Sequence, residues 1–254
     1  MMFRSPAIAL ILSAALLGAC AGTSGGPAAT APAGGKIRIT LVGDSTQTER
    51  QGYGTGFCAN LTADVDCVNR AKGGASTKTY RKDGLWQAAQ SPRPDWMLIQ
   101  FGHNDASKVN LDRQTDLATE YPENLRRFVR EARAEGIRPV LVTPIARRYF
   151  QPDGKIVDDL PGHVAATKAV AAELNVPVID LHTLSQARFE QLGEEAAHKL
   201  GPTKAGPNGT VVPDKTHFNL TGSYEMGRMV AEEMARRVPE LARYVRPQPA
   251  KAPQ

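Results

Sequence analysis

The chain has no apolar run long enough to cross a bilayer as a helix and no cluster of basic and aromatic residues. The run from Ala7 to Leu17 falls short of the roughly 20 residues that a transmembrane helix needs. Lysines and arginines exceed acidic residues by only five and are scattered along the sequence. These absences predict no membrane span in the mature chain and no nucleic-acid partner, and leave room for an acidic polymer as substrate.

Cysteine is scarce, with three residues in 254. If Cys20 is consumed by lipid or lost by cleavage, Cys58 and Cys67 remain as an even pair in an oxidising compartment. We therefore expect a local disulfide between them. The alternative is two buried free thiols.

Histidine is also scarce, with five residues. His163, His182 and His198 show no ligand spacing with one another or with the cysteines. His103 lies beside Asp105 in a loop, where we expect a positioning role rather than metal binding. The sequence therefore predicts no metal and no other cofactor.

The N-terminus has the order of parts of a bacterial export signal, with basic Arg4 ahead of the apolar run. Leu17-Gly18-Ala19-Cys20 is similar to the lipobox of lipoproteins, which implies a signal peptide over 1–19 and a lipid anchor at Cys20. Secretory cleavage after Ala21 is the alternative, since Ala19-Cys20-Ala21 also fits the small-x-small rule. Either route exports the protein to a membrane surface, the periplasm or the medium.

The composition divides the remaining chain into three parts. Residues 20–35 are rich in Gly, Ala, Pro and Thr and have nothing to bury, so we expect a flexible tether. Residues 36–245 are enough for one catalytic domain, which we expect to be a monomer. Residues 246–254 contain Pro247, Pro249 and Pro253 and are expected to be a disordered tail.

Apolar runs alternate with amphipathic segments along the domain. The runs are not alternating patterns, so they predict a parallel sheet covered on both faces by helices, an α/β fold. Ligands bind such sheets outside the carboxyl ends of the strands. The predicted strands are 37–42, 66–69, 96–101, 139–142 and 177–180, and the predicted helices are 56–62, 117–134, 163–174 and 221–237.

Polar residues that could cleave an ester follow these strands. Nucleophilic cleavage needs a hydroxyl, a base and a group that orients the base. Ser45 lies in the turn after the first strand. Asp214 and His217 lie three residues apart before the last helix, so the carboxylate can reach back to the imidazole. We predict Ser45 as nucleophile, His217 as base and Asp214 as its partner.

The oxyanion of the reaction needs hydrogen-bond donors. We assign the backbone N–H groups of Ser45 and Gly74 and the side-chain amide of Asn104 to this oxyanion hole. A serine in a Gly-Asp-Ser turn is, taken alone, more often a helix N-cap, and we expect Asp44 to hydrogen-bond its own turn. The Gly-x-Ser-x-Gly elbow of the α/β-hydrolases is absent around Ser45.

These motifs resemble the four blocks of the SGNH (GDSL) hydrolases. The blocks are Gly43-Asp44-Ser45, Gly74, Gly102-His103-Asn104-Asp105 and Asp214-Lys215-Thr216-His217. The first block ends in Thr46 rather than the common Leu, and this ending looks like the rhamnogalacturonan acetylesterase branch. The resemblance implies a flavodoxin-like three-layer α/β/α sandwich with a five-stranded parallel sheet.

The same resemblance implies removal of acetyl groups from a cell-wall polysaccharide. Alternatives are a lipid esterase of lysophospholipase or thioesterase type, and a non-catalytic surface module that binds carbohydrate. Four cations are candidates for contacting a galacturonate carboxylate, although long cations at a sheet edge are more often simply solvated. They are Arg81, Lys82, Arg147 and Arg148.

Overall fold

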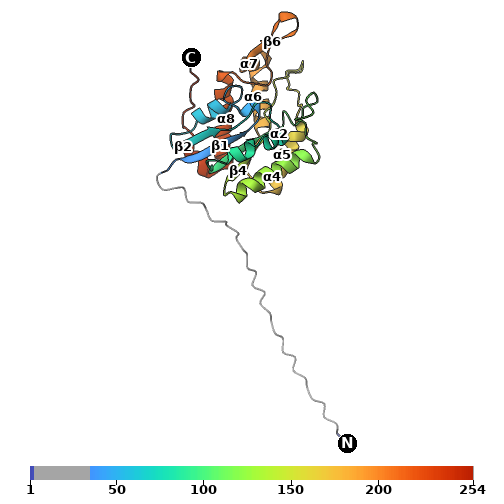
Figure 1. Cartoon of the computed structure of the whole chain (residues 1–254), viewed down its shortest axis with the longest axis vertical. Coiled ribbons are helices and arrows are strands. Elements are labelled where there is room, and N and C mark those ends of the chain that lie inside the picture. Colours follow the sequence, from blue (N-terminus) through green and yellow to red (C-terminus); the bar gives the residue numbers. More distant parts are fainter. Residues whose placement is uncertain (3–34, 254) are drawn as a thin grey trace. The chain divides into compact units, whose positions relative to one another are not determined.

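The computed structural model describes residues 1–2 and 35–253. Figure 1 draws the remaining residues as a thin grey trace. The predicted signal peptide (1–19), the tether (20–35) and the lipid site at Cys20 therefore lie almost wholly outside the described residues. They stay predictions.

Five parallel strands form the central sheet in the order β2-β1-β3-β4-β5. The residues of the inner strands are mostly buried on both faces, which is why these strands read as largely apolar runs in the sequence. The α/β class and the five-stranded parallel sheet are thus confirmed. The strands are β1 (Ile37–Gly43), β2 (Val65–Asn69), β3 (Trp96–Gln100), β4 (Arg138–Val142) and β5 (Val178–Ile179).

Each face of the sheet has its own hydrophobic core. On one face Ile39 and Leu41 pack with residues of α1 and α8, including Phe57 and Met226. On the other, Met97 and Ile99 of β3 belong to a core that includes residues of α2 to α5. Two helical layers therefore enclose the sheet, in the predicted three-layer arrangement (Figure 1).

The helices of the second face are α2 (Thr77–Lys82), α3 (Leu85–Ala89), α4 (Glu120–Ala134) and α5 (Pro161–Glu173). Those of the first are α1 (Gly54–Ala59), α6 (Leu181–Leu192), α7 (Glu194–His198) and α8 (Leu220–Arg237). The predicted helix at 56–62 begins and ends earlier than expected. Helices α2, α3, α6 and α7 were not predicted. Nor were a hairpin of β6 (Thr203–Ala205) and β7 (Val211–Pro213) and the 3-10 turns η1 (Ser45–Gln47), η2 (Pro207–Gly209) and η3 (Pro239–Tyr244).

The segment after η3, expected to be a disordered tail from residue 246, is attached to the domain. The Arg246 N–H donates to the Asn60 carbonyl at 2.9 Å, and its Nε donates to the Leu61 carbonyl at 2.9 Å. The Ala250 N–H donates to Asn60 Oδ1 at 2.9 Å. Proline stops a helix here, but these donors still find acceptors at the end of α1.

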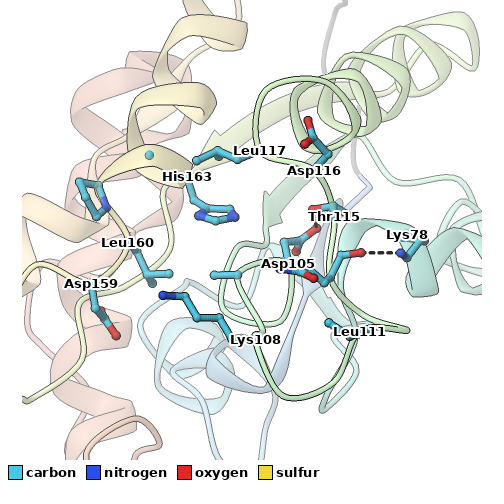
Figure 2. Close-up of a pocket in the computed structure, with 14 residues that line it drawn as sticks. Lys78, Asp105, Lys108, Leu111, Thr115, Asp116, Leu117, Asp159, Leu160 and His163 are labelled. Carbon is cyan, nitrogen blue, oxygen red and sulfur yellow. Dashed lines mark hydrogen bonds between the residues drawn. The ribbon is translucent and has the colours of Figure 1, made fainter.

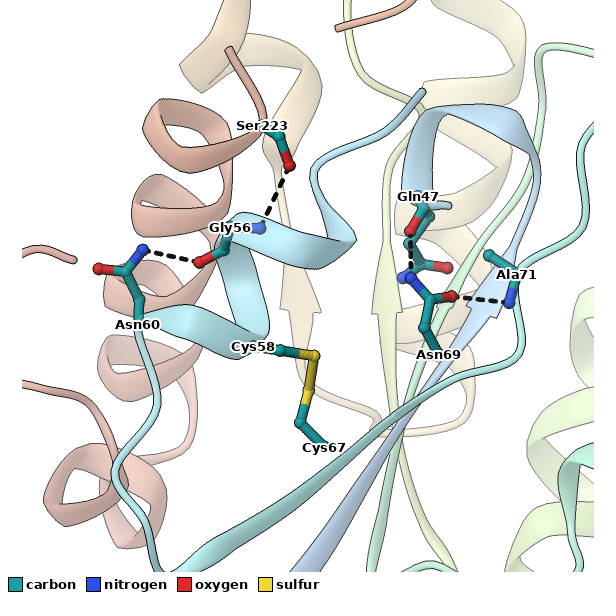
Figure 3. Close-up of a disulfide and its surroundings, with 8 residues drawn as sticks. All are labelled: Gln47, Gly56, Cys58, Asn60, Cys67, Asn69, Ala71 and Ser223. Atoms are coloured by element: carbon teal, nitrogen blue, oxygen red, sulfur yellow. Dashed lines mark hydrogen bonds between the residues drawn. A yellow bond between two sulfur atoms is a disulfide. The ribbon is translucent and has the colours of Figure 1, made fainter. Parts of the chain in front are cut away.

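Cys58 and Cys67 form a disulfide that joins α1 to β2, with their Cα atoms 5.6 Å apart (Figure 3). Both cysteines also pack against the core of the first face. The bond fixes α1 against the edge strand of the sheet. Both cysteines belong to the segment that leads from β1 through η1 and α1 into β2.

Replacing Cys58 and Cys67 together with serine should lower the free energy of unfolding by about 2–3 kcal/mol, because a disulfide restricts the unfolded chain and this loop is short. Urea unfolding followed by circular dichroism measures the change. Reductant should bring the natural protein to the midpoint of the double variant and leave the variant where it is. Equal midpoints without reductant would contradict the prediction.

Candidate active site

The turn after β1 presents Ser45 at the carboxyl edge of the sheet. Asp44, not Ser45, caps this turn, because Asp44 Oδ1 accepts from Thr46 N at 2.9 Å and from Thr46 Oγ1 at 2.8 Å. The side chain that satisfies the free N–H of η1 therefore belongs to the aspartate. The hydroxyl of Ser45 is left available for another partner.

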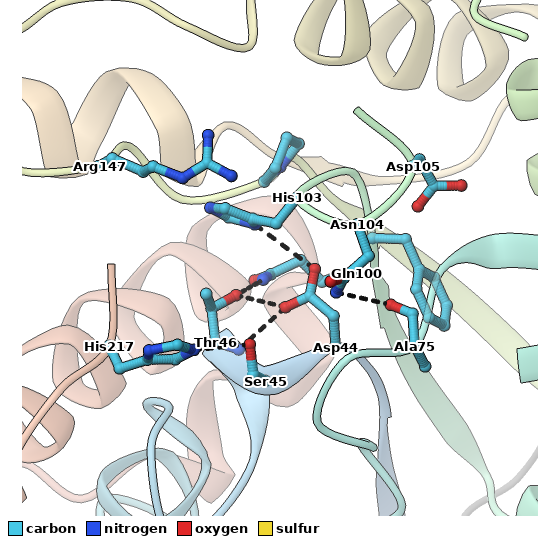
Figure 4. Close-up of polar contacts among 12 residues, drawn as sticks. Asp44, Ser45, Thr46, Ala75, Gln100, His103, Asn104, Asp105, Arg147 and His217 are labelled. Carbon is cyan, nitrogen blue, oxygen red and sulfur yellow. Dashed lines mark hydrogen bonds and ion pairs between the residues drawn. The ribbon is translucent and has the colours of Figure 1, made fainter. Parts of the chain in front are cut away.

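That partner is His217, from the loop before α8. Ser45 Oγ lies 2.9 Å from His217 Nε2, across 172 residues of sequence (Figure 4). His217 Nδ1 lies 2.9 Å from Asp214 Oδ2. The structure thus brings the three predicted catalytic residues into one continuous hydrogen-bonded row.

The Asp214 carboxylate is fixed from its own loop. Its Oδ1 accepts from Thr216 N at 2.8 Å and from His217 N at 3.0 Å. Burial raises the pKa of Asp214, but hydrogen bonds from His217 and Thr216 lower it more, to about 2. The group therefore stays ionised at neutral pH. An ionised partner favours a proton on Nδ1, which leaves Nε2 free to accept the serine proton.

The predicted oxyanion donors come from the loops after β2 and β3. Gly74 has a φ of +78°, which a residue with a side chain rarely adopts. Asn104 Nδ2 donates one hydrogen to the Ala75 carbonyl at 2.9 Å, and this bond ties the two loops together (Figure 4). The amide has a second hydrogen that can reach a ligand.

A buried polar network supports the turn from below. Gln100, at the end of β3, donates to Thr46 Oγ1 at 2.6 Å. His103 Nδ1 lies 3.4 Å from Asp44 Oδ2, and both side chains are buried. Burial raises the pKa of Asp44, but His103 and the Thr46 donors outweigh it and bring that pKa below its usual value.

Two side chains that were not predicted as site residues, Gln47 and Asn69, make three further hydrogen bonds. Gln47 donates to the Tyr53 hydroxyl at 3.0 Å. Asn69, at the end of β2, donates to the Gln47 carbonyl at 2.9 Å and accepts from Ala71 N at 2.9 Å (Figure 3). The sequence signal of Asn69 is a polar residue that ends a strand, as at Gln100, whereas Gln47 carries no such signal.

Asp105 forms its hydrogen bonds with two threonines and not with His103. Its carboxylate accepts from Thr77 N at 3.1 Å, Thr77 Oγ1 at 2.5 Å and Thr115 Oγ1 at 3.0 Å. Burial raises its pKa to about 7, against the opposing effect of these hydrogen bonds. His103 and Asp105 therefore do not form a ligand pair. Within 35–253, no group of three or more His, Cys, Asp and Glu residues could hold a metal ion.

Two cavities open near these loops. One of about 700 Å³ is lined by Lys78, Lys108 and His163 among others, and does not include the Ser45 row (Figure 2). The other, of about 730 Å³, is lined by residues that directly neighbour the site in sequence, namely Gly73 and Phe218. Neither cavity is lined by Ser45, Asn104 or His217 themselves.

Three of the four candidate cations are occupied within the protein. Arg81 pairs with Glu131 at 2.7 Å, and Arg147 pairs with Asp159. Arg148 is fully buried. Lys82 is exposed on α2. Arg148 is therefore not available to a substrate carboxylate, and it is not solvated either, because its guanidinium lies inside the domain.

The model of the GDSL-like lipase/acylhydrolase family matches residues 39–223. The chain belongs to this family. It is therefore a carboxylic ester hydrolase, and the block pattern read from the sequence is that of the GDSL hydrolases. None of the helices within the described residues combines the length and the apolarity that crossing a membrane requires.

Three similar proteins come from Bacillus subtilis. "Probable rhamnogalacturonan acetylesterase YesY" is 37% identical over 76% of this chain and 90% of its own length. Rhamnogalacturonan acetylesterase RhgT is 35% identical over 77% of this chain and 88% of its own. The crystal structure of YxiM has a TM-score of 0.67 at 27% identity and covers 79% of this chain. This GDSL chain spans 56% of the YxiM structure.

The raised pKa of Asp105 predicts a stability that falls as pH rises. The pKa is about 7 in the folded state and about 3.9 when unfolded, so the folded protein binds the proton more tightly. The stabilisation is fully present below about pH 4 and is lost as pH rises through about 7. Melting temperatures should therefore fall over this range more in the natural protein than in Asp105→Asn. Exposed Asp112→Asn is the matched control, and parallel pH curves for all three proteins would refute the prediction.

Proposed function

We propose that the protein is a serine esterase that removes O-acetyl groups from a cell-wall polysaccharide of pectin or rhamnogalacturonan type. The observation that carries the proposal is the unbroken row from Ser45 through His217 to Asp214, with 2.9 Å at each step. YesY is named a probable rhamnogalacturonan acetylesterase and RhgT a rhamnogalacturonan acetylesterase, and each matches this chain over most of its own length. The acetylated sugar is accordingly the substrate class we assign.

In the first half of the reaction, Ser45 Oγ attacks the acetyl carbonyl carbon while His217 Nε2 takes the hydroxyl proton. Asp214, ionised at working pH, stabilises the imidazolium that forms. The negative oxygen of the tetrahedral intermediate receives hydrogen bonds from the N–H groups of Ser45 and Gly74 and from Asn104. The intermediate expels the sugar oxygen, which takes the proton from His217.

In the second half, water attacks the acetyl group now bound to Ser45 Oγ. His217 accepts the water proton and returns a proton to Ser45 as acetate leaves. We assign the sugar to the cavity of about 730 Å³ that is lined by Gly73 and Phe218, the sequence neighbours of Gly74 and His217. We further propose, from the sequence at Cys20, that a lipid anchor holds the exported enzyme at a membrane.

Purified protein beginning at Lys36 should hydrolyse p-nitrophenyl acetate. Ser45→Ala should reduce kcat by at least about four orders of magnitude, since the nucleophile and its base act as a unit. The far-ultraviolet circular dichroism spectrum and melting temperature of the variant should match those of the natural protein. Retained turnover in a folded Ser45→Ala variant would end the assignment.

The choice of substrate is tested by the same enzyme on two panels. Acetate release should be faster from acetylated rhamnogalacturonan than from acetylated xylan. The rate on p-nitrophenyl esters should fall steeply from acetyl to octanoyl. A rate that rises with acyl length would instead favour a lipid esterase or thioesterase.

Asn104→Ala should lower kcat by about two to three orders of magnitude, with a small change in KM, because one donor to the developing oxyanion is removed. Half-buried Asn110, in the segment that follows, gives the matched control Asn110→Ala. Steady-state kinetics with p-nitrophenyl acetate measure both variants. Equal kcat values for the two would remove Asn104 from the oxyanion hole.

A further inference from the structure

Arg148 contacts the His217 loop from inside the protein. It lies in the segment after β4 and is fully buried. Its Nη2 donates to the Asp214 carbonyl at 2.8 Å and to the His217 carbonyl at 2.5 Å. Its own N–H donates to the Lys215 carbonyl at 2.8 Å. One residue thus binds three of the four carbonyls in the segment 214–217.

The guanidinium is held mainly by aromatic rings. Its central carbon lies 4.7 Å from the centre of the Phe218 ring and 5.6 Å from that of Phe189. Among the described residues, its Nε and Nη1 have no hydrogen-bond partner, and the carboxylate that acts on its charge is that of Asp214. Burial lowers the pKa of Arg148 to about 10, so the group still carries its charge at neutral pH.

A buried charge with so few partners is a poor device for stability alone. Burying an ion costs free energy that only good pairing offsets, and an apolar residue of similar volume is often as stable or more so. The contacts of Arg148 are concentrated instead on the two residues that orient the Ser45 row. A fork that grips the carbonyls of Asp214 and His217 together fixes the separation of their backbones.

The surroundings leave room for this fork and for little else. A Cβ atom on Gly201 would lie 2.3 Å from Arg148 Nη2, 2.7 Å from the Asp214 carbonyl and 2.8 Å from that of His217. Position 201 therefore accommodates only glycine while the guanidinium is in place. His198 Nε2, 3.0 Å from the Arg148 carbonyl, holds the backbone of the arginine itself.

We propose that Arg148 is a positioning residue that holds His217 in register with Ser45 by binding the carbonyls of Asp214 and His217. The proposal rests on the esterase function proposed above. Arg148 touches neither substrate nor the reacting atoms. Its effect is therefore on the rate of the chemical step and not on substrate binding.

The test is Arg148→Met in the full protein, with p-nitrophenyl acetate as substrate. We expect kcat to fall by roughly 10- to 100-fold, because small misplacements of a catalytic group have effects of this size. KM should stay within about two-fold and the melting temperature within a few degrees. Labelling of Ser45 by a fluorophosphonate should slow in the same proportion as kcat. Arg148→Lys should recover part of kcat, since an ammonium can still reach one carbonyl.

Arg138→Met is the matched control. Arg138 also stacks on an aromatic ring, 4.1 Å from the centre of Trp96, but it begins β4, at the opposite edge of the sheet. Its loss should leave kcat unchanged. Gly201→Ala places a Cβ atom where it would displace Arg148 Nη2 from the two carbonyls. This variant should lower kcat although the arginine is still present.

Three results would overturn the proposal. They are an unchanged kcat in folded Arg148→Met, a full kcat in Gly201→Ala, or a change confined to KM. If Arg148→Met does not fold, Arg148→Lys and Gly201→Ala decide by the same readouts. Failure of the esterase function itself is seen separately, as activity that survives Ser45→Ala.

Discussion

The whole site depends on the carboxylate of Asp44. It is completely buried, and it occupies both donors of Thr46, so the first turn after β1 is closed without using the serine. If Ser45 capped this turn, its hydroxyl would be committed to the backbone and could not face His217. The distance of 2.9 Å between Ser45 and His217 is therefore possible because the neighbouring aspartate does the capping.

The parallel sheet explains why four separate segments can meet around this turn. The carboxyl ends of β1, β2 and β3 are adjacent, so the loops that carry Ser45, Gly74 and Asn104 leave the same edge. Gln100, at the end of β3, contacts Thr46, and His103, in the loop that follows, contacts Asp44. These contacts fix the turn that carries Ser45 relative to β3. The fourth segment, with His217, is brought in by the start of α8 and by contacts from the segment after β4.

Much of this could be predicted from the sequence, and the parts that could are local. Asp214 and His217 are three residues apart, and Ser45 follows a strand of apolar residues, so their chemistry could be read from short windows. The parallel sheet was predictable because apolar residues dominate β1 and β3, with Arg38 and Thr40 in β1 and Gln100 in β3 as the exceptions. Short helices such as α3 were not predicted, because a stretch of five residues is too short to show the hydrophobic periodicity of a helix.

The positions of the C-terminal tail and of the candidate cations could not be predicted, for the opposite reason. Their partners are distant in sequence. Three prolines after Arg246 predict a loose end, but nothing in that segment reveals that Asn60 accepts its hydrogen bonds. Arg147 and Arg148 are the same residue type in adjacent positions. The fold sends one to Asp159 near the surface and the other beneath His217.

Of these two neighbouring arginines, only Arg148 contacts the loop that carries His217. Each face of the sheet has its own apolar core, and the buried guanidinium of Arg148 lies against Phe189 and Phe218 in one of them. The charge of this guanidinium lies beside two phenylalanine rings and against the carbonyls of Asp214 and His217. Positioning a loop that is anchored at one end by α8 requires a rigid donor at the other, and a planar guanidinium meets that need where an apolar side chain cannot. The interior of the protein thus contributes to the geometry of a reaction that takes place at its surface.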